Sequence, residues 1–137
     1  MTNKDMKKWI YSGVFLDGCS RKKLKNKFSL PDGWVECFDH MTLSYNDGSE
    51  YVKYVKSLLD GMVGKKVKLK VVAQGISESA YAVKVQVPAG LPTSQKITHI
   101  TLGYNPNASA VYSNYIENWN ELYDSFYVYG TIRHFES

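Results

Sequence analysis

A pattern of seven residues occurs twice in the chain, as HMTLSYN at 40–46 and as HITLGYN at 99–105. Both copies read His-x-Thr-Leu-x-Tyr-Asn. Successive side chains of a β-strand point to opposite faces, so each copy, taken as a strand, has its histidine and threonine on one face and apolar residues on the other. The fold therefore has to keep two polar strand faces, each with an imidazole and a hydroxyl, out of the core.

The alternation predicts which side chains share each face. On the first strand, the polar face is expected to carry His40, Thr42 and Ser44, and the core face Cys37, Met41, Leu43 and Tyr45. On the second strand, the polar face is expected to carry His99, Thr101 and Gly103, and the core face Ile100, Leu102 and Tyr104. Gly103 has no side chain and is expected to leave room on the polar face.

The remaining periodicities predict an α+β fold. Strands are expected at 9–16, 34–45, 65–75, 80–88, 97–104 and 125–135, and helices at 21–28, 50–63 and 110–121. Ser20 is expected to cap the first helix. No linker divides the chain, so residues 1–137 are expected to form a single domain of antiparallel sheet flanked by helices. The repeat of strand, turn and helix at 38–62 and 97–119 predicts two lobes that face one another across a central cleft, each with one copy of the motif.

Composition and charge restrict the class of partner. The formal charge of +4 comes from 17 Lys and Arg against 13 Asp and Glu, which favours a phosphate-bearing ligand and predicts no stable nucleic-acid complex. Aromatic residues make up 14% of the chain, more than its core requires, so some rings are expected to line a ligand site or a partner surface. The chain has no long apolar run, no secretory leader after Met1, and two cysteines without metal or disulfide spacing. We therefore expect a soluble, reduced, cytoplasmic protein with no membrane partner.

Two imidazoles that face one cleft suit phosphodiester chemistry. Histidine titrates near neutral pH, so one ring can be neutral and remove a proton from the attacking hydroxyl or water while the other is protonated and donates to the departing oxygen. A threonine two residues after each histidine lies on the same face, where its hydroxyl can stabilise charge on a non-bridging phosphate oxygen. The candidate residues are therefore His40, Thr42, His99 and Thr101.

A single His-x-Thr is also typical of a half-buried histidine bonded to the backbone. Two copies, among only three histidines in the chain, favour a shared function. No metal and no cofactor are expected, because two histidines without a well-placed carboxylate or thiolate make an incomplete ligand set. The third histidine, His134, is expected to take no part in catalysis.

Paired H-x-T motifs on opposed strands, here HMTL and HITL, resemble the 2H phosphoesterase superfamily. The likeness runs from YSGVFLD at 11–17 to the closing strand and covers nearly the whole chain. It implies a two-lobed α+β fold and metal-independent activity on cyclic phosphates and on 2′–5′ or 3′–5′ linkages. It also implies that His40 and His99 are the catalytic acid and base, in an order that the sequence does not assign, and that Thr42 and Thr101 bind phosphate.

Within the superfamily, the chain is most similar to viral anti-CBASS phosphodiesterases, which degrade the cyclic di- and trinucleotide messengers of bacterial immunity. This similarity implies the host cytoplasm as the location if the protein is virus-encoded. Tyr11 matches the early active-site tyrosine of these enzymes by position, although a core role fits it equally well. Their mid-chain tryptophan has no counterpart at 60–80, which leaves Trp9, Trp34 and Trp119 as candidates, and their late glutamate is a possible match for Glu136.

Two tyrosines follow the second motif. Tyr112 and Tyr115 lie where a loop could cover a ligand, and such rings stack on nucleobases whatever the base. Packing of a helix on the sheet accounts for Tyr115 as well, so Tyr112 is the expected substrate contact.

Together these observations predict a metal-independent phosphodiesterase that hydrolyses a cyclic di- or oligonucleotide by His/His general acid–base catalysis. The same four residues suit a 2′,3′-cyclic phosphodiesterase of RNA-end repair, or a protein that binds cyclic nucleotides without cutting them. A cyclic nucleotide messenger requires a compact pocket, whereas an RNA end requires a basic groove that leads outward.

Overall fold

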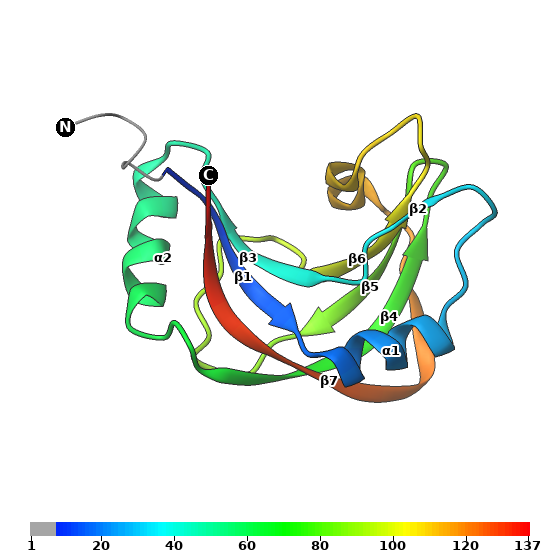
Figure 1. Ribbon diagram of the computed structural model, residues 1–137, viewed down its shortest axis with the longest axis horizontal. Helices are drawn as coiled ribbons and strands as arrows, with labels where there is room; N and C mark the ends of the chain where they lie inside the picture. Colours follow the sequence, from blue (N-terminus) through cyan, green and yellow to red (C-terminus); the bar gives the residue numbers. More distant parts are fainter. Residues whose placement is uncertain (1–7) are drawn as a thin grey trace.

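A computed structural model describes residues 8–137 of the chain (Figure 1). The strands are β1 (Trp9–Leu16), β2 (Val35–Glu36), β3 (His40–Tyr45), β4 (Lys66–Ile76), β5 (Ala80–Gln86), β6 (His99–Tyr104) and β7 (Asn120–Glu136). The helices are α1 (Gly18–Lys27), α2 (Glu50–Asp60) and the short 3-10 helix η2 (Ala110–Tyr115). None of the helices in this part of the chain combines the length and the apolar character needed to cross a membrane.

All the strands belong to one sheet in the order β2-β6-β3-β1-β7-β4-β5, and β5 also pairs with β6. This last pairing closes six antiparallel strands into a ring, with β2 added beside β6. The predicted α+β class and the antiparallel sheet with helices are confirmed. Because the sheet is continuous through both motif-bearing strands, the two-lobed description stays a prediction.

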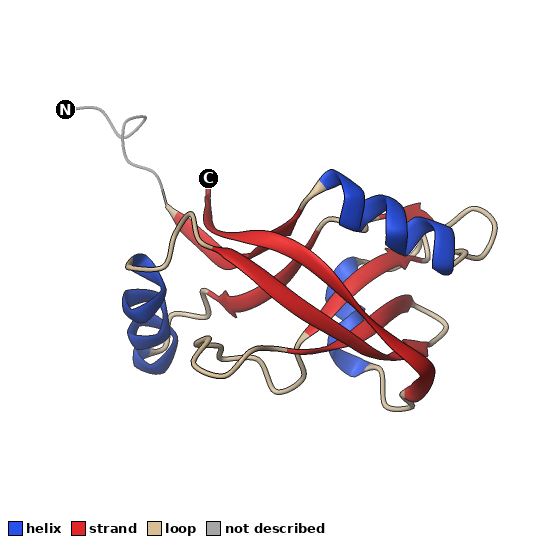
Figure 2. Ribbon diagram, turned by 90° about the horizontal axis from the view of Figure 1, so that it is seen from below, coloured by secondary structure: helices blue, strands red, loops and turns tan. Residues whose placement is uncertain are grey.

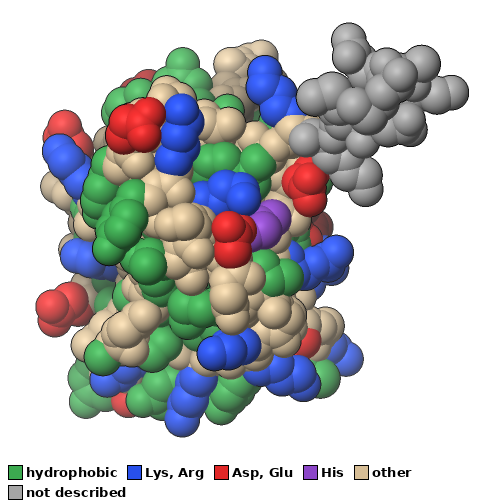
Figure 3. Space-filling model, turned by 90° about the vertical axis from the view of Figure 1, so that its left-hand side faces the viewer, with side chains coloured by type: hydrophobic (Ala, Val, Ile, Leu, Met, Phe, Trp, Pro, Cys, Tyr) green, Lys and Arg blue, Asp and Glu red, His purple; other side chains and the backbone are tan. Residues whose placement is uncertain are grey.

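The helices lie outside the strands and at opposite ends of the molecule. In both Figure 1 and Figure 2, α2 stands at one end, and α1 and η2 lie at the other. Helix α2 begins where the Ser49 side chain accepts a hydrogen bond from the Val52 backbone N–H, at 3.2 Å. Its buried face is Val52, Val55 and Leu59, while its exposed tyrosines belong to the mixed polar and apolar surface at that end (Figure 3).

The core is one cluster of buried side chains from the strands, from α1 and from α2. Its fully buried members come from nearly every strand and include Val14, Met41, Leu43, Leu69, Ile100, Leu102, Val128 and Ile132. Met41, Leu43, Ile100 and Leu102 are the apolar positions of the two repeated motifs, so this part of the alternation is confirmed. Burial of these side chains fixes which face of β3 and of β6 points away from the core.

Helix α1 begins earlier than expected. Asp17, not Ser20, caps it, since the Asp17 carboxylate accepts a hydrogen bond from the Ser20 backbone N–H at 2.7 Å. The Ser20 hydroxyl is buried and instead accepts from the Tyr129 backbone N–H at 2.8 Å, which ties α1 to β7. The sequence identified a capping residue of the right type but missed the better-placed one three positions earlier.

The helix expected at 110–121 is wrong in extent. Only η2 forms there, and from Asn120 the chain already belongs to β7. Ile116 ends the turn and packs with Ala80 and Ala82 in a small separate cluster that includes Trp119. The packing of Ile116 and Trp119 against the sheet favours an extended chain over a continued helix.

Candidate active site

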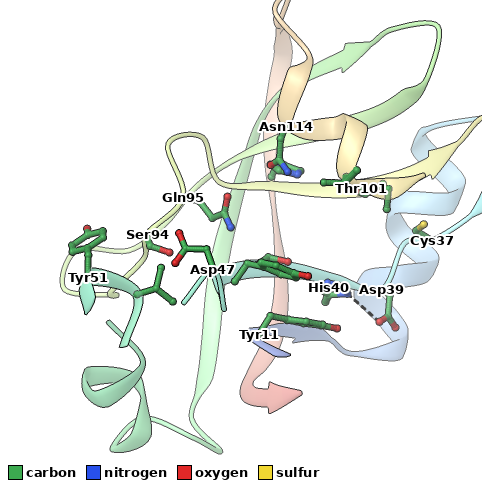
Figure 4. Close-up of a pocket in the computed structure, with 16 residues that line it drawn as sticks. Tyr11, Cys37, Asp39, His40, Asp47, Tyr51, Ser94, Gln95, Thr101 and Asn114 are labelled. Carbon is green, nitrogen blue, oxygen red and sulfur yellow. Dashed lines mark hydrogen bonds and ion pairs between the residues drawn. The ribbon is translucent and has the colours of Figure 1, made fainter. Parts of the chain in front are cut away.

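The two repeated motifs meet at one cavity. Strand β3 pairs with β6 through Met41 and Ile100, the residues that follow the two histidines. A cavity of about 590 Å³ is lined by both histidines and both threonines of the motifs, His40, Thr42, His99 and Thr101, and by Tyr11 (Figure 4). The structure thus brings together side chains that lie 59 positions apart in the chain (99 minus 40).

An irregularity in strand pairing carries His40 into the cavity. Glu36 pairs with Gly103 and Met41 with Ile100, so four residues on the first segment face only two on β6. The backbone N–H of Phe38 still donates to the Thr101 carbonyl, at 3.2 Å, which leaves Asp39 and His40 as the additional residues. Phe38 has a positive φ of 51°, unusual for an aromatic residue, at this point. Bulges of this kind commonly re-aim a side chain beside a functional site.

A second bulge corrects the expected face of Tyr45. In the pairing of β1 with β3, Ser12 faces Ser44 and Gly13 faces Thr42, so Leu43 is an extra residue on β3. Beyond the bulge the alternation is inverted: Ser44 is fully buried, while Tyr45 is exposed and lines the cavity. The core position assigned to Tyr45, and the polar-face position assigned to Ser44, are therefore wrong.

Two glycines allow the close backbone approaches around the motifs. A Cβ on Gly13 would lie 2.6 Å from the Met41 carbonyl oxygen, so β1 and β3 approach this closely only without a side chain. A Cβ on Gly103 would lie 2.6 Å from both the Leu30 side chain and the Val35 carbonyl oxygen. The prediction that Gly103 leaves room on the polar face is therefore wrong, because the segment around Leu30 fills that space.

His99 is set up as a neutral imidazole. Its Nδ1 lies 3.0 Å from the Ile97 carbonyl oxygen, and since a carbonyl only accepts, Nδ1 carries the hydrogen and Nε2 the free lone pair. Burial lowers the pKa of His99; the hydrogen bond to the Ile97 carbonyl opposes this shift, and the electrostatic effect of His40 adds a smaller lowering. These are the properties of a proton acceptor at neutral pH.

His40 has a different environment. Its Nδ1 lies 3.2 Å from Oδ2 of Asp39, which is the dashed contact in Figure 4. Its ring stacks on Tyr11, with centroids 4.8 Å apart, and on Phe15, with centroids 5.3 Å apart. A carboxylate accepts the Nδ1 hydrogen and interacts favourably with an imidazolium, while the two rings fix the plane of the imidazole.

The threonine and tyrosine hydroxyls complete this end of the cavity. Oγ1 of Thr101 lies 2.9 Å from Oγ of the buried Ser113, which attaches η2 to β6, whereas the Thr42 hydroxyl has no hydrogen-bond partner within residues 8–137. Burial, and then the Asp39 carboxylate, raise the pKa of Tyr11, so its phenol stays protonated and can donate. Three hydroxyl groups therefore line the same cavity as the histidines.

Several cavity residues were not identified from the sequence. They are Cys37, Asp39, Tyr45, Asp47, Tyr51, Val52, Ser94, Gln95, Ala110, Val111 and Asn114. Tyr45 belongs to the first motif and Asp47 follows it directly, so their place in the chain was an available signal. Ser94 and Gln95 lie five and four residues before His99, and they reach the cavity because the Leu43 carbonyl accepts hydrogen bonds from the Ser94 N–H and the Thr93 hydroxyl.

Other candidate residues lie elsewhere. Tyr112, the expected substrate contact, does not line the cavity; it projects from η2 beside Tyr115, with ring centroids 6.1 Å apart. Trp34 and Glu136 are also outside the cavity lining. His134 bonds to the buried Ser12 through Nδ1 and to Asp60 through Nε2, at 2.8 Å, so it joins β1, β7 and α2.

Comparisons with known proteins identify the fold. No protein-family model matches the chain, and no curated protein matches it in sequence. A solved structure titled "Crystal Structure of Fungal RNA Kinase" is similar, with a TM-score of 0.66 and 14% identity over 92% of this chain. The match covers 46% of the fungal chain, so this chain spans about half of that protein. At this identity the likeness establishes a shared fold alone.

Proposed function

We propose that this chain is a metal-independent phosphodiesterase of the 2H type, with two lobes that each supply one His-x-Thr motif to a shared active site. The observation that carries the proposal is the convergence of the two motifs on one cavity with their histidines in unlike environments. General acid–base catalysis needs this asymmetry, because one group has to accept a proton while the other donates one.

We assign His99 as the base of the first step and His40 as the acid. The free Nε2 of His99 takes the proton of the attacking hydroxyl as the new O–P bond forms. Nε2–H of His40, whose other nitrogen faces Asp39, donates to the leaving oxygen as its bond to phosphorus breaks. In the second step the roles reverse, since the deprotonated His40 accepts a proton from water and the protonated His99 donates to the leaving ribose oxygen.

The hydroxyls stabilise the charge that develops on phosphorus-bound oxygens. If Ser113 donates to Oγ1 of Thr101, the Thr101 proton is free for the phosphate. Thr42 and the protonated phenol of Tyr11 are the other donors to the non-bridging oxygens.

The preferred substrate is a cyclic di- or oligonucleotide messenger, cleaved in viral counter-defence in the host cytoplasm. For a 3′–5′ linkage, the ribose 2′-hydroxyl is the first nucleophile and yields a 2′,3′-cyclic phosphate that water then opens. This route needs no protein nucleophile. Because the 2′-hydroxyl is the nucleophile, a substrate that is 2′-deoxy at the cleaved position should resist cleavage. Rapid cleavage of that deoxy substrate would eliminate the route.

The fold likeness to a fungal RNA kinase favours a second candidate, the opening of 2′,3′-cyclic phosphates on RNA ends. A third candidate is a protein that binds cyclic nucleotides and does not cut them. Mass spectrometry of the products from a panel of cyclic dinucleotides and an RNA oligonucleotide with a cyclic end, in buffer with EDTA, separates the three. Cleavage of the messengers supports the proposal, selective opening of the RNA end supports the second candidate, and complete recovery of bound, uncut ligand supports the third.

A further inference from the structure

The cavity extends well beyond the two histidines. In Figure 4, Tyr51, Ser94 and Asp47 lie at one end, while His40, Asp39 and Thr101 lie at the other. A volume of about 590 Å³ is more than one phosphate group occupies and falls in the usual range for sites that hold a whole small molecule. We call the part lined by Asp47, Tyr51, Ser94 and Gln95 the distal end.

One aromatic ring, Tyr51, lies at the distal end, and a second, Tyr45, lines the cavity and precedes Asp47 by two residues. Tyr45 is the last residue of β3, directly opposite Tyr11 on β1, and Tyr51 is in the first turn of α2. Both rings are largely exposed, at 56% and 60%, although both line the cavity. Exposed aromatic faces inside a concave site are suited to stacking on a planar ligand.

Two polar side chains beside these rings have hydrogen-bonding atoms without a partner in the described part of the chain. Oδ1 of Asp47 accepts a hydrogen bond from the Ser49 backbone N–H at 2.8 Å, while Oδ2 has no partner within the described part of the chain. Hydrogen bonds from Ser49 lower the pKa of Asp47, so its carboxylate is ionised and only accepts. The side-chain amide of Gln95 is likewise without a hydrogen-bond partner among residues 8–137, and its backbone is held by the Thr93 hydroxyl at 3.1 Å.

We propose that the distal end is a nucleobase subsite with a preference for guanine, in which Tyr45 and Tyr51 stack on the base and Asp47 reads its edge. Guanine presents a ring N–H and an adjacent exocyclic amine, two neighbouring donors that match a carboxylate, and Gln95 can donate to its carbonyl oxygen. Adenine and cytosine present a ring acceptor at this edge, which repels a carboxylate, and uracil has a single donor. The subsite rests on the proposed function, since the base belongs to a nucleotide whose phosphate lies at the histidines.

Binding of mononucleotides tests the subsite without any turnover. The probes are 5′-GMP, 5′-IMP, 5′-AMP, 5′-UMP and inorganic phosphate, with affinities from NMR titration or calorimetry. GMP should bind about tenfold more tightly than AMP, the equivalent of one good hydrogen-bonded edge contact. IMP, which lacks the exocyclic amine, should lie between them.

Matched variants locate the preference. Asp47→Asn keeps the oxygen that caps Ser49 but places an amide where Oδ2 was, so the GMP preference should disappear, while Asp124→Asn, which does not line the cavity, should leave it unchanged. Tyr51→Ala should weaken all four nucleotides by about tenfold, in the range of one lost base stack, without affecting inorganic phosphate. Tyr54→Ala is the control, because Tyr54 is equally exposed on α2, at 61%, but does not line the cavity.

Equal affinity for GMP and AMP, or a preference that survives Asp47→Asn, would overturn the subsite. Guanine binding with no cleavage of any phosphodiester would refute the proposed function and leave the subsite standing. Phosphodiester cleavage that is unchanged by both Asp47→Asn and Tyr51→Ala would support the proposed function and refute the subsite.

Discussion

Replacement of Asp39 tests how His40 is held. Oδ2 of Asp39 lies 3.2 Å from Nδ1 of His40, and half of the Asp39 side chain, 50%, is exposed to solvent. Water screens such a pair, so the interaction is worth about 0.2–1 kcal/mol. Because 1.4 kcal/mol corresponds to a factor of ten, Asp39→Ala should lower kcat by about 1.4- to fivefold, with KM unchanged.

The conservative variant separates hydrogen bonding from charge. The Asp39→Asn side chain keeps an oxygen that accepts the Nδ1 hydrogen of His40, so kcat should fall less than with alanine. Steady-state kinetics on the best substrate measures both variants, with Asp32→Ala, outside the cavity lining, as the control. A loss of about 100-fold or more, the range for removal of a general acid, would mean that Asp39 itself takes part in proton transfer and that its positioning role is wrong.

Two further predictions concern His99 and Gly103. Burial lowers the pKa of His99, so its neutral form persists below the usual histidine pKa of about 6.5. The rising limb of kcat/KM against pH should therefore lie below about pH 6.5. A rising limb above that pH would contradict the assignment of His99 as the base. The unfolded chain binds a proton at His99 more readily than the folded chain does. The contribution of His99 to the free energy of unfolding should therefore be lost as pH falls from about 6.5 through the lower folded-state pKa. A His99→Asn variant should lack this pH dependence when the free energy of unfolding is measured in urea. Gly103→Ala should destabilise the fold by about 1–3 kcal/mol in the same assay, because the new Cβ meets a backbone oxygen at 2.6 Å. Gly18→Ala should not, because a Cβ there has nothing within 4 Å. Equal effects of the two variants would show that the segment around Leu30 can move aside.

The sequence predicted much of the secondary structure and the central pairing of motifs. Strand β1 has the predicted bounds, and the apolar positions of β3 and β6 are buried as the alternation requires. These features are local, since they follow from periodicity within one strand. The convergence of His40 and His99 needed more than periodicity, and it was the repeat itself that indicated a shared site.

The parts that the sequence did not predict depend on irregular pairing. The extra residue Leu43 in β3 turns Tyr45 outward, and the additional Asp39 and His40 directly follow Phe38, which adopts a positive φ. No periodicity in the chain marks these bulges, which are set by the register of neighbouring strands. The closure of the ring through β5 and β6 is likewise a pairing that no local periodicity marks.

The central claim is that both histidines act on one phosphate. The direct measurement is the turnover of a cyclic dinucleotide by the wild-type protein, His40→Ala and His99→Ala in EDTA, with products identified by mass spectrometry and folding checked by circular dichroism. We expect linear products from the wild type and losses of about two to four orders of magnitude in each folded variant. Uncut ligand from the wild-type protein across the substrate panel, or unchanged turnover in either variant, would contradict the account.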